Sequence, residues 1–148
     1  MNEMRFTVQI NANRKQVWET LWRDETFRQW AGIIDPGTHI EGELKEGEKV
    51  QFISGNGYGV SSLVAKLVAG EFLLLRHQAD TQDNGKRERD EQWTGGEESY
   101  ALAENDGATT LTVTFGVPPE LEDEFRNNYP KALECVKLLA EKGTGQPL

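Results

Sequence analysis

The sequence predicts an α+β fold in which a curved antiparallel sheet of about seven strands wraps around a long C-terminal helix. Two observations predict this fold. An apolar stripe recurs at helical spacing from about Pro119 to Lys142, and short runs of alternating apolar and polar residues precede it. A terminal helix with such a stripe buries it by lying across the sheet, and a helix and curved sheet together can enclose a cavity.

The N-terminal part of the chain is predicted to form one strand followed by two short helices. Apolar and polar residues alternate over 4–10, which is the period of a half-buried strand. Asn13 and Gln16 form a capping-box pattern, so the first helix is expected to begin there. The second helix is expected to follow Asp24 and to end at Gly32.

The middle of the chain is predicted to be a meander of antiparallel strands, because turn residues separate its apolar runs. The segment 83–92 mixes charges of both signs and has no apolar period, so we expect a solvated hairpin tip or loop there. The glycine-rich stretch 55–59 precedes a strand and lacks the lysine of a phosphate-binding loop, which favours a hairpin. The strands are expected near 39–44, 49–54, 58–68, 72–80, 97–103 and 109–117.

The final helix is the best-defined element of the sequence. Pro119 suits its first turn, and acidic residues follow there, where they interact favourably with the helix dipole. Pro130 removes one backbone hydrogen bond, so a bend is expected near it. The tail 143–148 is expected to fray. With 148 residues and no linker composition, the chain is expected to be one domain, 1–148.

Composition argues against several classes of function. The net charge of -9 has the wrong sign for nucleic acid or an anionic membrane surface. No run of the sequence has the length and apolar character of a signal peptide or a spanning helix, so a cytoplasmic protein is expected. Cys135 is the single cysteine, and no Cys/His spacing suggests a metal site. We therefore expect no metal and no cofactor.

This order of elements resembles the helix-grip fold of the steroidogenic-acute-regulatory-related lipid-transfer and birch-pollen-allergen superfamily. Within it, the chain is similar to bacterial homologues of the activator of the heat-shock-protein-90 ATPase. Where similar sequences often carry tryptophan before the proline of the last helix, this chain has Tyr129. The resemblance covers nearly the whole chain and is carried by Phe27 with Gln29-Trp30, Glu41-Gly42 with Glu46-Gly47, His77, Trp93, Glu98 with Tyr100 and Leu102, Gly107 with 109–113, and 129–133.

The two-residue period of the strands indicates which side chains would face a cavity in such a fold. On 72–80, the frame that turns Arg76 to solvent places Leu75 and His77 inside. A few inward polar groups in an apolar cavity would fix the orientation of a ligand. The residues predicted to bind a ligand are His77, Tyr100, Trp93, Phe52, Leu75, Leu102, Phe125, Tyr129 and Leu133.

Each of these residues also has a purely structural interpretation. His77 could be a histidine satisfied by a backbone group or a water, and Glu98 could be solvated near its strand end. Tyr100 and Trp93 could simply fill the core. The tryptophans at 18, 22 and 30 are interpreted first as a packing cluster, and Cys135 as an apolar side chain rather than a nucleophile.

Three hypotheses about function follow. The leading one is non-catalytic binding of a small hydrophobic or amphipathic molecule, with His77 and Tyr100 holding its polar end. The second is an enzyme of the cyclase or hydrolase type that uses His77 and Glu98 as an acid/base pair. The third, implied by the family resemblance alone, is a chaperone partner contacted through an exposed apolar patch, for which Trp18 and Trp22 are the candidates.

Overall fold

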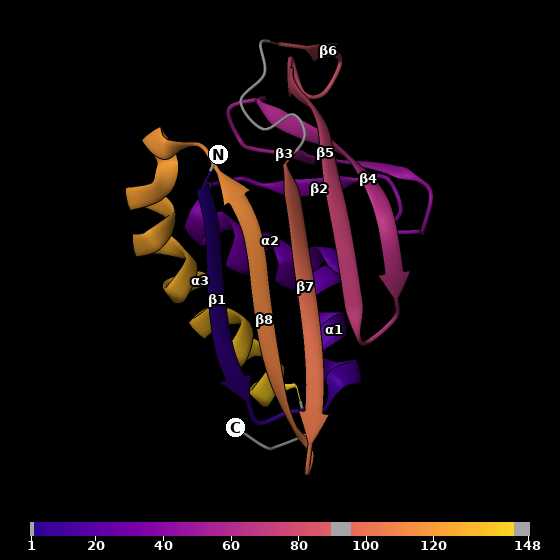
Figure 1. The fold of residues 1–148 in the computed structure, drawn as a ribbon, viewed down its shortest axis with the longest axis vertical. Helices are drawn as coiled ribbons and strands as arrows, with labels where there is room; N and C mark the ends of the chain where they lie inside the picture. Colours follow the sequence, from indigo (N-terminus) through magenta and orange to yellow (C-terminus); the bar gives the residue numbers. More distant parts are fainter. Residues whose placement is uncertain (1, 90–95, 144–148) are drawn as a thin grey trace.

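The computed structural model describes residues 2–89 and 96–143 and shows an antiparallel sheet with α-helices packed on one of its faces (Figure 1). The strands run in the order β1-β8-β7-β5-β4-β3-β2, with β6 pairing with β5 beside this path. The predicted α+β architecture is confirmed. The strands are β1 (Asn2–Ile10), β2 (His39–Glu41), β3 (Lys49–Ile53), β4 (Gly59–Val68), β5 (Phe72–Gln82), β6 (Arg87–Glu88), β7 (Glu97–Asn105) and β8 (Ala108–Val117).

The first two helices are α1 (Arg14–Trp22) and α2 (Asp24–Ile34). Asn13 caps α1 as its sequence predicts, because its side chain accepts a hydrogen bond from the backbone N–H of Gln16 at 2.8 Å. The prediction that Gly32 ends the second helix is wrong. The helix continues to Ile34, and the N–H of Asp35 closes its last turn on the carbonyl of Ala31.

The meander agrees with the sequence in its order and differs at two places. The predicted strand at 39–44 is shorter, since β2 ends at Glu41 and Gly42 follows with a positive φ. The segment 83–92, predicted to be a hairpin tip or loop, contains β6, which pairs with the end of β5 in a short hairpin. Residues 90–92 of that segment lie outside the described residues. The sequence did not predict this short strand, because both of its residues are charged and exposed and so show no apolar alternation.

The C-terminal helix begins with one 3-10 turn, η1 (Pro119–Leu121), and continues as α3 (Glu122–Lys142). The α-helix therefore starts three residues later than its apolar pattern predicts. Its buried stripe packs with β1, α1 and α2, and Pro130 lies on the exposed side. The expected bend at Pro130 remains a prediction, as does the single domain. The tail expected to fray, 143–148, lies outside the described residues except for Gly143. The stripe consists of Tyr129, Ala132, Leu133, Val136 and Ala140.

An aromatic cluster joins the helices to the sheet. The ring of Trp22 contacts those of Trp18, Trp30 and Tyr100, with 4.8 Å between the centroids of Trp22 and Tyr100. The indole N–H of Trp30 donates to the carbonyl of Leu21 at 3.1 Å, which fixes α2 against α1. The expected packing cluster of tryptophans is confirmed. Within the described residues, no helix is long and apolar enough to span a membrane.

Candidate functional site

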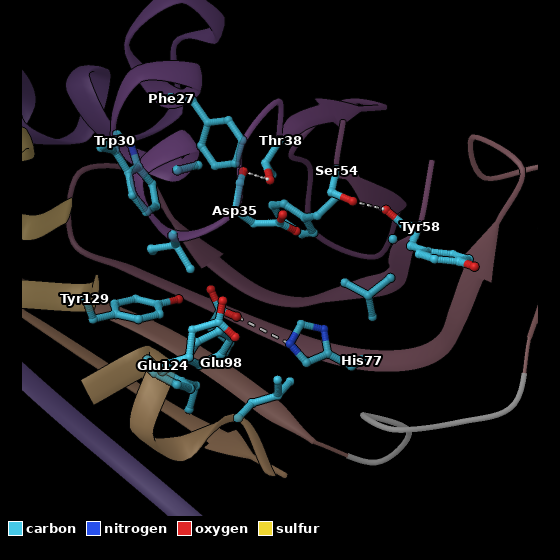
Figure 2. A pocket seen from close by; sticks show the side chains of 18 of the residues that line it. Phe27, Trp30, Asp35, Thr38, Ser54, Tyr58, His77, Glu98, Glu124 and Tyr129 are labelled. Carbon is cyan, nitrogen blue, oxygen red and sulfur yellow. Dashed lines mark hydrogen bonds and ion pairs between the residues drawn. The ribbon is translucent and has the colours of Figure 1, made fainter. Parts of the chain in front are cut away.

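A cavity of about 330 Å³ lies between the sheet, helix α2 and the first turns of α3 (Figure 2). Helix α2 contributes one wall, the β3–β4 hairpin a second, and strands β5, β7 and β8 the floor. Aromatic side chains dominate these walls. They are Phe27, Trp30, Phe52, Tyr58, Tyr100, Phe115, Phe125 and Tyr129.

The period of the strands brings three polar side chains to the floor of this cavity. His77 on β5 and Glu98 and Tyr100 on β7 all point to the helix-covered face, as the alternation predicts. A register shift between β4 and β5 places Ser62 opposite His77, while its neighbour Ser61 pairs with Ala79. This irregularity brings the Ser62 hydroxyl to the imidazole, and the alternation of the sequence did not predict it.

These side chains form one connected polar network. Ser62 Oγ lies 2.6 Å from His77 Nδ1, and His77 Nε2 lies 3.4 Å from Glu98 Oε1. The hydroxyl of Tyr100 donates to Glu98 Oε2. Figure 2 shows Glu98 between the Tyr129 phenol and the His77 imidazole. His77 is 5% exposed and Glu98 18%, so the network is largely removed from water. The expectation of a solvated Glu98 is not met.

Burial changes the titration of the two phenols in this network. Desolvation raises the pKa of Tyr100 well above its ordinary value, and the neighbouring Glu98 carboxylate raises it further. Desolvation and Glu98 also raise the pKa of Tyr129 well above the usual range, while a hydrogen bond with Tyr100 opposes this rise. Both phenols therefore stay protonated at neutral pH, and the one O–H of Tyr100 is donated to Glu98.

The mouth of the cavity carries further charged groups. Asp35 follows the end of α2, Glu124 lies in the first turn of α3, and Arg89 follows β6. Burial raises the pKa of the Asp35 carboxyl, the charge of Glu124 raises it further, and a hydrogen bond from Ser54 lowers it.

A close approach of two backbone segments fixes the position of Asp35. The N–H of Gly55 donates to the carbonyl of Pro36 at 3.0 Å, so the β3–β4 hairpin holds the turn that follows α2. A Cβ atom at Gly37 would lie only 2.6 Å from the Cα of Gly55, and Gly37 has φ +80°. Glycine is therefore required at Gly37 for this contact. The glycine-rich stretch 55–59 is confirmed as a hairpin, and it borders the cavity.

The structure brings most of the predicted ligand-binding residues together. His77, Tyr100, Phe52, Phe125 and Tyr129 line the cavity, and so does Glu98. Three predicted residues are not among the lining ones. Leu75, Leu102 and Leu133 are buried in the core beside it. Trp93 lies outside the described residues.

Sequence reasoning missed several residues of the site. No pattern in the sequence indicated that Ser62 belongs to the site, because only the register shift between β4 and β5 places it beside His77. Asp35 opens the sequence Asp35-Pro36-Gly37, which predicts a turn and no site. Its proximity to Glu124 depends on how α2 packs against α3. Arg89 was assigned to a solvated segment. Arg89 lies among charged residues, and arginines in such segments are mostly exposed, so only the fold identifies it as lining a cavity.

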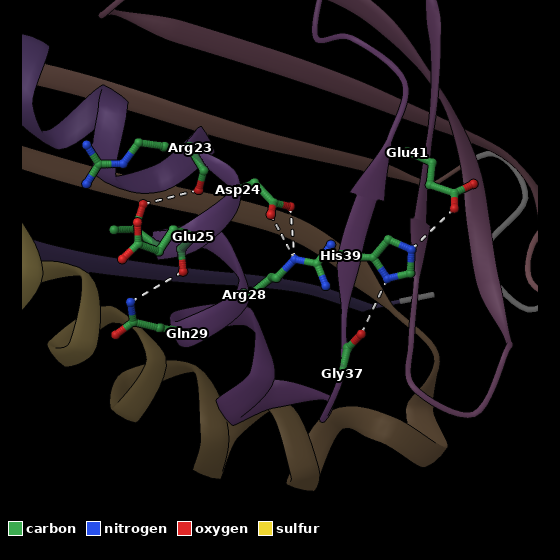
Figure 3. A network of polar contacts seen from close by, with 9 residues as sticks. Arg23, Asp24, Glu25, Arg28, Gln29, Gly37, His39 and Glu41 are labelled. Carbon is green, nitrogen blue, oxygen red and sulfur yellow. Dashed lines mark hydrogen bonds and ion pairs between the residues drawn. The ribbon is translucent and has the colours of Figure 1, made fainter.

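The second histidine, the cysteine and two of the tryptophans do not line the cavity. His39 contacts Glu41 at 3.4 Å and the carbonyl of Gly37 at 3.5 Å in a surface network (Figure 3). Burial raises the pKa of the Cys135 thiol, which makes it a poor nucleophile. Over the described residues, no three His, Cys, Asp or Glu side chains are grouped so as to hold a metal ion. Trp18 and Trp22 are half-buried and form no exposed apolar patch.

Comparisons with known proteins agree with this architecture. A family model described as "Activator of Hsp90 ATPase homolog 1-like protein" matches residues 11–138. Among curated proteins, none matches the chain. The solution structure of the Aha1 dimer from Colwellia psychrerythraea is similar to it with a TM-score of 0.73 and 20% identity, covering 98% of this chain and 100% of that one.

Two further solved structures have the same fold. Protein MLL2253 from Mesorhizobium loti aligns with a TM-score of 0.73 and 12% identity over 96% of this chain and 98% of that chain. DynU16, a putative protein in the dynemicin biosynthetic locus, aligns with a TM-score of 0.70 and 18% identity over 99% of this chain. The chain spans only 49% of DynU16. At these identities the likeness shows the fold alone, and that fold is the helix grip.

Proposed function

The chain belongs to the family of activator of Hsp90 ATPase homolog 1-like proteins, and we propose that it binds a small hydrophobic or amphipathic molecule in its cavity without catalysing a reaction. Family and fold together support a ligand-binding or activator-like module. The observation that carries the proposal is the cavity of about 330 Å³, with aromatic walls and a polar floor. Ligand sites in proteins combine these two features.

The floor and the walls of the cavity contact different parts of the ligand. Tyr100 and His77 lie on the floor and contact Glu98, and the oxygen atoms of this network accept hydrogen bonds from a polar group of the ligand. Phe52 and Phe125, from the hairpin side and from α3, contact its apolar body. Water leaves the aromatic walls when the ligand enters, which is the main favourable contribution to binding.

Filling the cavity tests this proposal. Val60 lines the cavity and is half-buried, whereas Val68 at the other end of the same strand is 39% exposed and lies outside it. Titration with 1-aminoanthracene, an uncharged fluorescent probe at neutral pH, is expected to give binding to the wild type and to Val68→Trp. Val60→Trp is expected to bind at least roughly tenfold more weakly, because the indole occupies the space of the probe.

A parallel experiment identifies the natural ligand. The purified protein is denatured, extracted with organic solvent, and examined by mass spectrometry for a stoichiometric small molecule. A compound that is present with wild type and Val68→Trp and absent with Val60→Trp supports the proposal. Equal retention of the compound and equal binding of 1-aminoanthracene by all three proteins would refute binding in this cavity.

A second candidate function is proton-transfer catalysis by His77 and Glu98. His77 Nε2 lies 3.4 Å from Glu98 Oε1, and both side chains line the cavity. This favours catalysis, because an acid/base pair has to lie within hydrogen-bond reach of a bound molecule. The extracted ligand is incubated with wild type and with Glu98→Gln, and its structure is followed by mass spectrometry. Conversion by the wild type alone would support catalysis, and an unchanged ligand would support binding only.

An activator-like role would use the surface instead of the cavity. Within the described ranges, the large exposed apolar side chains lie on different elements, on α2, on the β3–β4 hairpin, at the end of β4 and on α3. They are Ile33, Tyr58, Val68 and Leu138. No observation therefore favours a partner surface over the cavity, and ATPase measurements with the host chaperone at saturating protein would detect stimulation.

A further inference from the structure

The cavity carries an excess of negative charge among its described lining residues. Asp35, Glu98 and Glu124 contribute three carboxylates, and Arg89 contributes one guanidinium. The carboxylates come from the end of α2, from β7 and from α3, so they face the cavity from both the helix side and the sheet side. Figure 2 shows Asp35 across the cavity from Glu98 and Glu124.

The positive charge of Arg89 is already engaged with protein groups. Its Nη2 lies 4.0 Å from Oδ2 of Asp80, which is 1% exposed, and its Nε donates to the carbonyl of Thr81 at 3.2 Å. Its guanidinium also lies 4.4 Å from the ring centroid of Tyr58. An anionic ligand would have to compete with a buried carboxylate for this arginine, which disfavours anions.

The other donors of the site are engaged in the same way. His77 contacts Ser62 through Nδ1 and Glu98 through Nε2, and Tyr100 donates to Glu98. The carboxylates of Asp35 and Glu124 instead repel each other at the mouth, and this repulsion contributes to the raised pKa of Asp35. A positive charge placed between them would relieve the repulsion.

The walls add a second attraction for cations. The rings of Phe27, Trp30, Phe52 and Phe125 line the same cavity as Asp35 and Glu124. The faces of aromatic rings attract organic cations, and the attraction grows when the cation is removed from water. The aromatic walls would therefore contact the apolar body of such a molecule, and the carboxylates would contact its ammonium group.

We propose that the ligand of this cavity is an organic cation, an apolar body carrying a protonated amine that lies between Asp35 and Glu124. This inference rests on the proposed function, because it names the class of molecule that the same cavity binds. A neutral alcohol of the same body binds more weakly, and a carboxylate binds most weakly.

Two series of matched probes test this preference. The first comprises 1-naphthylmethylamine, 1-naphthylmethanol and 1-naphthoate, and the second comprises octylamine, octanol and octanoate. Each is titrated into the 15N-labelled full chain at pH 7 and low salt, with affinity and location read from amide shifts around the cavity. We expect the amine to bind roughly tenfold more tightly than the carboxylate of the same series, as a charge-assisted contact allows.

Variants separate the charge from the shape of the site. Glu124→Gln is expected to weaken amine binding several-fold and to weaken alcohol binding much less, because the alcohol carries no charge. Glu120→Gln changes the net charge equally, but Glu120 lies outside the cavity lining, so both affinities should stay as in the wild type. Retained alcohol binding shows that the variant is folded.

Each outcome decides the inference. Equal or tighter binding of the carboxylates would overturn the cation preference and leave the proposed cavity function standing. Equal weakening of amine binding by Glu124→Gln and Glu120→Gln would also overturn it, because the effect would then be one of net charge. If no probe of either series shifts the cavity amides, the proposed function and this inference both fail.

Discussion

The Nε2 atom of His77 lies 3.4 Å from Oε1 of Glu98, and both side chains border the cavity. The other oxygen of Glu98 accepts a hydrogen bond from Tyr100, and the other ring nitrogen of His77 contacts Ser62. Because the network is largely buried, water cannot fully replace a partner that is removed. The loss of any one member should therefore be measurable in both stability and binding.

Removing the phenolic hydroxyl of Tyr100 tests its bond to Glu98. Tyr100→Phe leaves a largely buried carboxylate without one donor, so we expect a loss of about 1 to 3 kcal/mol in the free energy of unfolding, measured in urea. Tyr58→Phe is the matched control, because Tyr58 is 45% exposed. It should change the free energy by less than about 0.5 kcal/mol. An equal effect of the two variants would contradict the network.

The raised pKa values of Tyr100 and Tyr129 predict the response to alkali. Folding favours the protonated phenols, so their contribution to stability is present below the ordinary pKa of 10.0 and is lost as the pH rises above it. In Tyr58→Phe, where only these two tyrosines remain, the phenolate absorbance at 295 nm should appear together with the loss of circular dichroism. Absorbance that rises well before unfolding would contradict this prediction.

The hydroxyl of Ser62 is expected to hold one tautomer of His77. With Nε2 facing a carboxylate, the proton of a neutral imidazole lies on Nε2, and Nδ1 accepts from Ser62. Ser62→Ala should cost roughly 1 to 3 kcal/mol and change the 15N shift of Nδ1 in NMR spectra. Ser61→Ala, at the half-buried neighbouring position, should leave the imidazole signals unchanged. Unchanged signals in both variants would exclude the contact.

The stripe of α3 predicts two very different costs for the same substitution. Leu133 is 3% exposed and Leu138 is 58% exposed on the same helix. Leu133→Ala should lower the free energy of unfolding by about 2 to 5 kcal/mol, because it leaves a cavity in the core. Leu138→Ala should change it by less than about 0.5 kcal/mol. Similar urea midpoints for the two variants would show that α3 packs through another face.

The Asp35 carboxyl is expected to contribute less to the free energy of unfolding at neutral pH than at acidic pH. Its pKa is raised, so the folded protein holds the proton more tightly than the unfolded chain does, and stability falls as the pH rises from 3.8 through the raised value. Asp35→Asn should therefore stabilise the protein at pH 7, by less than about 1 kcal/mol because the mouth is solvated. The gain should vanish below pH 3.8. Glu120→Gln controls for net charge.

Local patterns predicted most of the fold. The alternation around His77 and Tyr100 gave the correct inward face of β5 and β7, since a strand has only two faces and one of them must be buried. The buried stripe of α3 was also predicted correctly, because its apolar residues recur with the period of a helix. The predicted helix end at Gly32 was wrong, because glycine is also tolerated inside a helix when its neighbours pack well.

The composition of the cavity depended on contacts between distant segments. Leu75, Leu102 and Leu133 point inward as predicted but pack in the core beside the cavity, because the period of a strand or helix gives the face of a residue and not its position along that element. Asp35 and Arg89 reach the cavity from a turn and from the residue after a short strand, and their local sequences did not indicate that a cavity lies there. Charged residues in such places are usually solvated, so no local rule assigns them to a site.

The sequence by itself determined the order of the elements, the buried face of each long strand and the apolar stripe of the last helix. These depend on periods of two and 3.6 residues, which any short window contains. Only the tertiary structure decided that Ser62 meets His77, that Glu98 joins the imidazole to the phenol of Tyr100, and that Asp35 faces Glu124. Those contacts depend on strand register and helix packing, which are set by the balance of interactions over the whole core.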